Sequence, residues 1–371
     1  MKLTHLALLI GTLATAVACG GGSSSTPAAA TSDSSSAPAA ATTSGGKRDL
    51  TVAGFGGTTQ EVFKQIYFTP FANQTGKPVL EESYDGGYGI LQSKIQSGNP
   101  NWDIVQVEVE ELIRGCDDGL FEKLDWDKLG GKDKYIDGSA SDCGVGNMVW
   151  STILTYDGDK LKEAPKSWAD FWNVEKFPGK RALRKGPKYT LEFALLADGV
   201  KKEDLYTVLA TPEGLDRAFK KLDELKPHLI WWEAGAQPLQ FLASGEVVMA
   251  STYSGRIPGL NKTENRNFKM VWPESIYAID SWVILKDAAN KDAAMDLIAF
   301  ASLPENQVKM PMNNIAYGVT NKAAIPNVPA EFSKDLPTTP ANQKDAIFLN
   351  GDFWIDNSEE LTERFNAWLS K

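Results

Sequence analysis

The sequence predicts an α/β fold with two lobes, and three observations support this. Strand and helix patterns alternate along most of the chain, which is typical of parallel α/β sheets. The chain has 371 residues, more than the ~250 to 300 at which a single core stops growing. Hydrophobic residues make up 42% of it and charged residues 23%, as in ordinary globular proteins.

The first predicted elements form a strand–helix–strand–helix–strand series. Residues 49–55 (DLTVAGF), 78–84 and 102–107 (WDIVQV) are apolar runs typical of strands. Residues 60–74 and 89–97 between them have the spacing of helices. Strands that are joined through helices run parallel, so we expect a parallel sheet in the first half.

A second series of the same kind follows and predicts a second lobe. It is followed by one more strand and one more helix. The predicted strands are 181–183, 247–250 and 276–285, and the predicted helices are 190–198, 212–226 and 291–301.

The N-terminus has the pattern of a lipoprotein export signal. Lys2 and the apolar run Leu6–Val17 are followed by small residues and then by Cys19. We expect a signal peptide over 1–18, lipidation of Cys19 and a flexible linker over 19–46, because that segment is almost entirely Gly, Ser, Thr, Ala and Pro. The alternative is an ordinary secreted protein, since Ala16 stands where bacterial lipoproteins usually have leucine.

Charge and histidine content exclude several classes of function. A formal net charge of −10 argues against nucleic acid as a partner. The histidines are His5 and His228, so we expect neither a metal site nor a Ser-His-Asp triad. No Gly-rich nucleotide loop occurs, and we expect no cofactor.

Two further cysteines, Cys116 and Cys143, remain in an exported chain. Export to an oxidising compartment favours a disulfide between them. Two buried free thiols are the alternative.

Aromatic and polar residues gather where the predicted strands end. Ligands of open α/β sheets bind beyond the carboxyl ends of strands, so these segments predict a binding site. In addition, Gly56 and Gly57 precede a helix and leave backbone amides available for a ligand oxygen. The segments are 54–59 (GFGGTT), 84–88 (YDGGY), 108–111, 253–256 (YSGR) and 277–282 (YAIDSW).

Several stretches together resemble one family, the extracellular solute-binding proteins of bacterial ABC importers, in the spermidine/putrescine-binding branch. They are 166–172 (KSWADFW), 177–180 (FPGK), 242–247 (LASGEV), 278–282 (AIDSW) and 314–319 (NIAYGV). The resemblance implies a type II periplasmic-binding-protein fold, with two α/β lobes of mixed, mainly parallel sheets joined by crossover strands. It places residues 47–152 and 283–371 in lobe 1 and residues 153–282 in lobe 2. Hinges are expected near 150–156 and 275–283.

The resemblance also suggests how the ligand is bound. Asp280 stands at the family's amine-binding aspartate, and Phe55, Tyr253 and Tyr317 supply aromatic walls that attract ammonium groups. Other acidic residues expected for a polyamine are replaced by the Gly56 turn and by the segment 185–189.

Two arginines, Arg184 and Arg256, are added in exchange and could bind a carboxylate. The full predicted ligand-binding set is Phe55, Gly57, Thr58, Tyr84, Glu108, Glu110, Arg184, Tyr189, Trp232, Tyr253, Arg256, Asp280, Trp282 and Tyr317.

We therefore expect a monomeric, extracytoplasmic binding protein that closes on a small amine-bearing solute and delivers it to a permease. The solute is a polyamine such as putrescine or spermidine, or an ω-amino acid such as 4-aminobutyrate. Presentation of the ligand to a chemoreceptor is an alternative with the same fold. An exported hydrolase that uses Glu108 and Asp280 as paired carboxylates is a weaker alternative.

Some of these residues also have a structural interpretation. Asp280 could cap a turn or pair with a lysine. Arg184 and Arg256 could form ion pairs within their own lobe. Glu108, Glu110 and Glu111 could simply be a charged helix start, favourable at the positive end of the helix dipole.

Overall fold

The computed structural model describes residues 48–98 and 100–371. The predicted signal peptide, the lipidation site Cys19 and the linker lie outside the described residues. Within the described part, the helices are all too short or too polar to cross a lipid bilayer.

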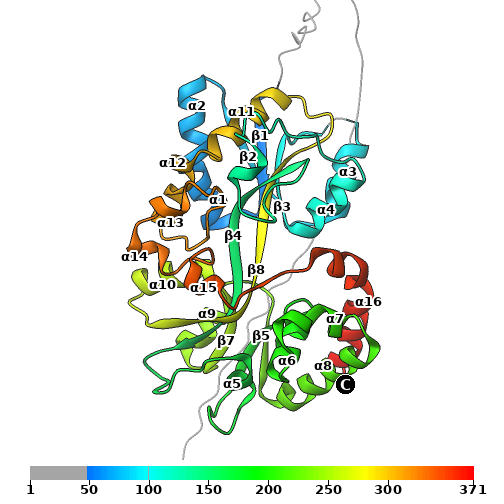
Figure 1. Ribbon diagram of the computed structural model, residues 1–371, viewed down its shortest axis with the longest axis vertical. Coiled ribbons are helices and arrows are strands. Elements are labelled where there is room, and N and C mark those ends of the chain that lie inside the picture. The colour runs from blue at the N-terminus through cyan, green and yellow to red at the C-terminus, as the bar shows by residue number, and fades with distance from the viewer. Residues whose placement is uncertain (1–47, 99) are drawn as a thin grey trace, which may run out of the picture. The chain divides into compact units, whose positions relative to one another are not determined.

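One mixed sheet runs through the folded body. Its strand order is β2-β1-β3-β8-β4-β7-β5-β6, and β9 pairs with β8 (Figure 1). The three strands at each end of this order run parallel to one another, whereas the central strands β8 and β4 pair antiparallel. The strand bounds are β1 Leu50–Gly54, β2 Val79–Ser83, β3 Ile104–Val107, β4 Gly144–Asp157, β5 Arg181–Arg184, β6 Leu229–Trp232, β7 Met249–Tyr253, β8 Phe268–Ile284 and β9 Ile347–Phe348.

We call β1–β3 and the helices that surround them the first lobe. In Figure 1 these helices lie at the same end of the long strands as β1–β3. They are α1 Gly57–Phe63, α2 Thr69–Thr75, α3 Tyr88–Gln96, α4 Val109–Asp117, α11 Lys291–Ala301, α12 Pro304–Gln307 and α13 Lys309–Met312; a π-helical segment, Lys64–Phe68, joins α1 to α2.

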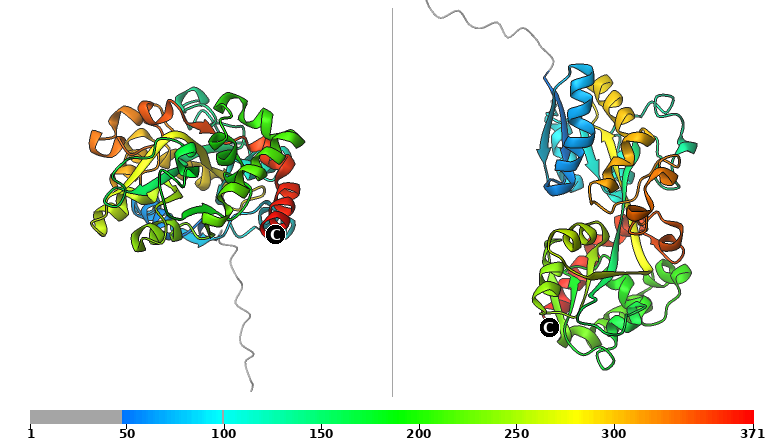
Figure 2. Two further views of the ribbon diagram at one scale, coloured as in Figure 1. Left: turned by 90° about the horizontal axis from the view of Figure 1, so that it is seen from below. Right: turned by 90° about the vertical axis from the view of Figure 1, so that its left-hand side faces the viewer.

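We call β5–β7 and the helices around them the second lobe. These helices lie at the opposite end of β4 and β8, which the turned view in Figure 2 also shows. They are α5 Trp168–Trp172, α6 Thr190–Ala197, α7 Leu205–Leu209, α8 Pro212–Leu225, α9 Gln237–Ser244 and α10 Ile257–Thr263.

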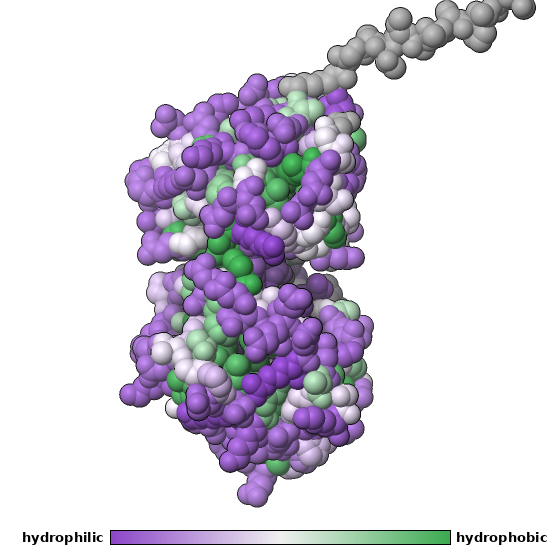
Figure 3. Space-filling view, turned by 90° about the vertical axis from the view of Figure 1, so that its right-hand side faces the viewer, coloured by the Kyte–Doolittle hydropathy of each residue, from purple (hydrophilic) through white to green (hydrophobic). Residues whose placement is uncertain are grey.

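The long strands β4 and β8 connect the two lobes. They have 14 and 17 residues and stay paired over most of their length, with irregularities in register near Gly146 and Thr152. The space-filling view narrows at the level where these strands pass between the lobes (Figure 3). The predicted hinge segments 150–156 and 275–283 lie in these two strands.

The C-terminal helix α16 (Gly351–Leu369) contacts both lobes. At its start, a Cβ atom on Gly351 would lie 2.9 Å from Ile113 of α4. Near its end, the rings of Phe365 and Trp368 pack edge-on against Trp231 of β6. Between α13 and α16 lie α14 Ala330–Ser333 and α15 Pro340–Gln343.

The fold class expected from the sequence is confirmed, and so are most of the predicted elements. The strand predicted at 276–285 is much longer than expected. In the structure β8 already begins at Phe268 and continues through Pro273. Cys116 and Cys143 form the predicted disulfide, so the alternative of two free thiols is wrong. The division into 47–152 with 283–371 and 153–282 stays a prediction, and the contacts of α16 show that this helix touches both predicted parts.

Candidate ligand-binding site

A cavity of about 490 Å³ lies where the two lobes face each other, and we call it the main cavity. First-lobe residues reach it from the ends of β1, β2 and β3, and second-lobe residues reach it from β5, β7 and the turns that follow. Its lining is Phe55, Gly56, Thr59, Tyr84, Asp85, Gly86, Gly87, Gln106, Glu108, Glu111, Met148, Trp150, Arg184, Gly235, Tyr253, Arg256, Asp280 and Tyr317.

Asp280 is the most deeply buried acidic residue of the main cavity. Asp280 is only 2% exposed, and its two carboxylate oxygens accept hydrogen bonds from Trp150 Nε1 (2.7 Å) and Gln106 Nε2 (2.9 Å). Burial raises the pKa of Asp280 well above its usual value, and the negative charge of Glu108 adds to this effect. The carboxylate is therefore held in place by neutral donors and lacks a cationic partner among the described residues.

Aromatic rings form the walls next to this carboxylate. Tyr253 packs edge-on against Trp150, with ring centroids 5.3 Å apart, and Phe55 stacks on Tyr84 at 5.4 Å. Tyr317 completes the wall, and it fits closely because Gly255 has no side chain. A Cβ atom on Gly255 would lie 2.2 Å from the Tyr317 ring. Carboxylate and aromatic faces together suit an ammonium group.

Two arginines face the main cavity from the second lobe. Arg184 is the last residue of β5, and Arg256 follows the turn after β7. Gly235 leaves room for Arg256 and for the Tyr253 ring, since a Cβ atom there would lie 3.2 Å from Arg256 Nε and 3.0 Å from that ring. Within the described residues, neither arginine has a carboxylate oxygen within ion-pair distance, so both could bind the carboxylate of a ligand.

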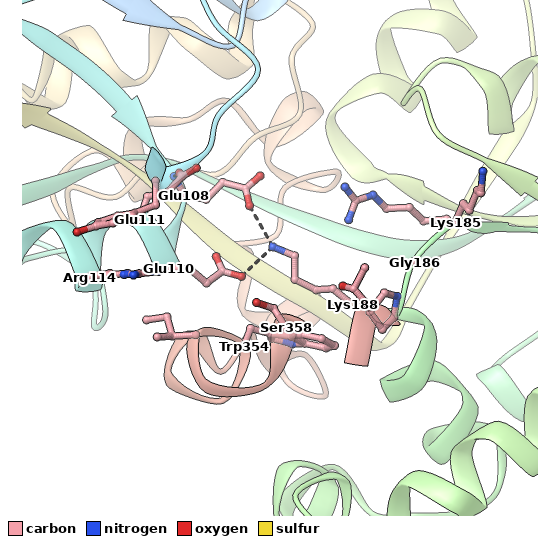
Figure 4. Close-up of a pocket in the computed structure, with 14 residues that line it drawn as sticks. Glu108, Glu110, Glu111, Arg114, Lys185, Gly186, Lys188, Trp354 and Ser358 are labelled. Carbon is pink, nitrogen blue, oxygen red and sulfur yellow. Dashed lines mark hydrogen bonds and ion pairs between the residues drawn. The ribbon is translucent and has the colours of Figure 1, made fainter. Parts of the chain in front are cut away.

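A second hollow of about 440 Å³, the side groove, adjoins the main cavity and shares Glu108, Glu111 and Arg184 with it. It lies between α4, the turn 185–188 and α16 (Figure 4). Glu111 Oε2 accepts a hydrogen bond from the backbone of Glu108 (2.7 Å), and its other oxygen accepts one from Gly87 (2.5 Å). Glu111 therefore forms a capping box with Glu108 at the start of α4, which agrees with the structural interpretation of this segment as a charged helix start.

Comparison with known proteins bears on what this site belongs to. The model of the family "Bacterial extracellular solute-binding protein" matches residues 67–353. The chain is 50% identical to the gamma-aminobutyric acid-binding protein of Pseudomonas aeruginosa over 324 residues, which cover 87% of this chain and 92% of that protein. The chain belongs to the bacterial extracellular solute-binding proteins.

More distant relatives agree with this membership. The spermidine/putrescine-binding periplasmic protein of Escherichia coli is 24% identical over 320 residues, 85% of each chain. A solved structure of a GABA receptor is 34% identical, with a TM-score of 0.78, and covers 87% of this chain and 98% of its own. As a member of this family, the chain is an extracytoplasmic substrate-binding protein of an ABC importer and not an enzyme.

The structure brings most of the predicted site residues together. Glu110 lies in the side groove, and eight others line the main cavity of this solute-binding protein. These eight are Phe55, Tyr84, Glu108, Arg184, Tyr253, Arg256, Asp280 and Tyr317.

The structure places the other five predicted residues outside both hollows. Trp232 is fully buried and donates to Ser251 Oγ (3.1 Å) beneath Tyr253. Trp282 packs in the core against Phe63. Tyr189 is 1% exposed and packs edge-on against Trp150, so it supports the wall from behind.

The remaining two, Gly57 and Thr58, are exposed, and their neighbours Gly56 and Thr59 line the cavity instead. The backbone amide of Gly56 donates to Gln60 Oε1 (2.8 Å), so the expectation that it is available to a ligand is wrong.

Several lining residues were missed by the sequence analysis, above all Trp150 and Gln106. Both lie on strands whose residues are buried on both faces, so no alternation of polar and apolar residues marks the side that faces the cavity. Trp150 was expected near a hinge, and it lies in the predicted hinge segment as well as in the cavity wall.

Proposed function

We propose that this solute-binding protein binds an ω-amino acid, with 4-aminobutyrate (gamma-aminobutyric acid) as the best candidate. The observation that carries the proposal is the separation of charges in the main cavity. Asp280 and its aromatic neighbours form an acidic end, and Arg184 and Arg256 form a basic end. A ligand with an ammonium group and a carboxylate group complements both ends.

The two ends belong to different parts of the fold, which suggests how binding drives closure. Gln106, Tyr84 and Phe55 contribute to the acidic end from the first lobe, and Tyr253 is its one aromatic wall from β7, whereas both arginines come from the second lobe. A ligand that satisfies both ends contacts both lobes at once, so it favours a closed arrangement that the permease recognises.

The names of the relatives support this ligand over a polyamine. The relative named for gamma-aminobutyric acid shares 50% identity with this chain, whereas the spermidine/putrescine-binding relative shares 24%. A long polycation also fits the cavity poorly in charge, since its additional ammonium groups would approach the two arginines.

Attachment of the mature protein to a membrane through a lipid on Cys19 is part of the same proposal. The signal pattern before Cys19 and the Gly/Ser-rich stretch after it support a protein tethered outside the cytoplasmic membrane. Mass spectrometry of the protein extracted from membranes would detect acyl chains on an N-terminal Cys19 peptide, and a soluble product cleaved elsewhere would contradict the anchor.

Calorimetric titration of the purified chain tests the ligand. We expect 4-aminobutyrate to bind with a micromolar or lower Kd. Butylamine, which lacks the carboxylate, and butyrate, which lacks the ammonium, should each bind at least about 30-fold more weakly, because a lost charged contact costs about 2 to 5 kcal/mol. Micromolar binding of spermidine without binding of 4-aminobutyrate would overturn the proposal.

A further inference from the structure

The ammonium group of Lys188 lies between two glutamates that belong to the opposite lobe. Lys188 comes from the turn after β5, and Glu108 and Glu110 come from the start of α4. Lys188 Nζ is 2.8 Å from Glu110 Oε1 and 3.2 Å from Glu108 Oε2, as the dashed lines in Figure 4 show.

All three groups are partly shielded from water. The side chains of Lys188, Glu110 and Glu108 are 21%, 19% and 37% exposed. The charge of Lys188 keeps the pKa of Glu108 below its usual value. Burial lowers the pKa of Lys188, but the two glutamates outweigh this effect and raise it overall, so the lysine stays charged.

The backbone around Lys188 fixes the place from which its side chain starts. Lys185 N donates to Trp232 O (2.9 Å), and Leu191 N donates to Pro187 O (3.0 Å). Tyr189 next to it has a φ of 70°, a region that non-glycine residues rarely occupy. Such a backbone conformation persists only where the surrounding structure enforces it, so we infer that this turn has little freedom to move.

Glu108 links this ion pair to the ligand site, because it lines both the main cavity and the side groove. Without a partner, Glu108 and Glu110 would form a second acidic site beside the one at Asp280. Glu110 Oε2 is buried and has no hydrogen-bond partner among the described residues, so this acidic pair still has acceptor capacity.

We propose that Lys188 is a specificity-determining residue that occupies, with its own ammonium group, the place that the second ammonium of a diamine would take. The proposal rests on the proposed function and names the feature that separates an ω-amino acid from a diamine of similar length. With Lys188 present, the cavity offers one ammonium site, at Asp280. A second ammonium group on the ligand would be repelled by the positive charges of Lys188 and Arg184. Without Lys188, Glu108 and Glu110 become available to that second cation.

The test compares 4-aminobutyrate with putrescine, which has an ammonium group in place of the carboxylate. Calorimetric titration gives the ratio of the two affinities for the unchanged chain and for Lys188→Gln. We expect the variant to favour putrescine by at least tenfold more than the unchanged chain does. Lys188→Arg keeps the charge and should restore the original preference.

Lys221→Gln is the matched control. It removes the same charge from a similarly buried side chain, 17% exposed, but Lys221 pairs with Glu224 of its own helix (2.7 Å) and lines neither hollow. Its affinity ratio should stay within twofold of that of the unchanged chain. Thermal unfolding of each variant shows whether it is folded.

The outcomes separate the two proposals. If the unchanged chain does not bind 4-aminobutyrate, the proposed function fails. If the unchanged chain binds it and Lys188→Gln leaves the ratio unchanged, or if Lys221→Gln changes the ratio equally, the role of Lys188 is overturned. Should Lys188→Gln fail to fold, Glu110→Gln in the Lys188→Met background gives a second measurement. The double variant has the same net charge at this cluster as the unchanged chain, which should improve folding relative to the single lysine variant. Putrescine binding as tight as that of 4-aminobutyrate would still support the role, whereas the original preference would refute it.

Discussion

At the scale of single residues, Asp280 determines how the site behaves before the ligand arrives. The carboxylate is buried and has two neutral donors, Trp150 and Gln106, but no cation beside it among the described residues. Ionisation there is costly, and Glu108 increases the cost. Under the proposed function, the ligand's ammonium group would offset this cost, so part of the binding free energy would come from stabilising a carboxylate that is unfavourable in the free protein.

The raised pKa of Asp280 gives the pH dependence of binding a definite sign. Burial, and then Glu108, raise this pKa in the free protein, while a bound ammonium lowers it again. Binding at a pH below the free pKa must therefore release a proton, and affinity should fall by up to about tenfold per unit as pH decreases through that value. Titration in buffers of different ionisation enthalpy measures the proton release.

Asp280→Asn provides the control for that prediction. The amide keeps the shape but cannot ionise, so we expect binding to weaken by about 2 to 5 kcal/mol and the pH dependence to disappear. The ligand-free variant should unfold at a higher Tm than the unchanged chain near neutral pH, because a group with a raised folded-state pKa destabilises the fold once it is ionised. An unchanged affinity would remove Asp280 from the site.

At the scale of elements, α4 connects the ligand site to the disulfide. Glu108 is its N-cap residue, its first turn carries Glu110 and Glu111, and Cys116 lies in its last turn. Cys116 is bonded to Cys143, the residue before β4 begins. The disulfide thus attaches the far end of α4 to the start of a strand that carries Trp150 into the cavity.

Removing this disulfide should lower the stability of the fold more than it changes ligand binding. The two cysteines are 27 positions apart, and closing a loop of that size is worth roughly 3 kcal/mol on the chain-entropy model. We expect Cys116→Ser with Cys143→Ser to lose about that much free energy of unfolding in urea. Reducing the unchanged chain should reproduce the loss, and a loss below about 1 kcal/mol in both experiments would contradict the prediction.

The sequence predicts elements of this fold better than it predicts the site. Apolar runs bounded by turn residues predicted β1 and β3, and helical spacing predicted the helices between them, because local pattern determines such elements. Trp232 and Trp282 were assigned to the ligand because they lie near strand ends, but their rings face the core. The Lys188 ion pairs join residues 80 and 78 positions apart, and no local pattern signals a contact of that kind.

At the scale of the folded body, two strands carry the structural connection between the lobes. Within the one mixed sheet, β4 and β8 run from the strands of the first lobe to those of the second lobe, and the side chains of Trp150 on β4 and Asp280 on β8 are hydrogen-bonded to each other. The acidic end of the cavity is therefore close to the expected pivot, whereas Arg184 and Arg256 come from the part of the second lobe that would move. A change in the angle between lobes alters the distance between the two ends of the site much more than the surroundings of Asp280.

This geometry predicts that a ligand with two charged ends makes the protein more compact, whereas a ligand with one charged end does not. Small-angle scattering with saturating 4-aminobutyrate should give a smaller radius of gyration than the ligand-free chain, because the ammonium at Asp280 and the carboxylate at the arginines favour the closed arrangement together. Butylamine at a concentration that saturates the acidic end is the matched control, and it should leave the radius unchanged, since it has no carboxylate for the two arginines of the second lobe. The radii could also be equal with and without 4-aminobutyrate, at a concentration where calorimetry shows full occupancy. That result would mean that the protein binds its ligand without closing. The permease would then recognise something other than a closed form.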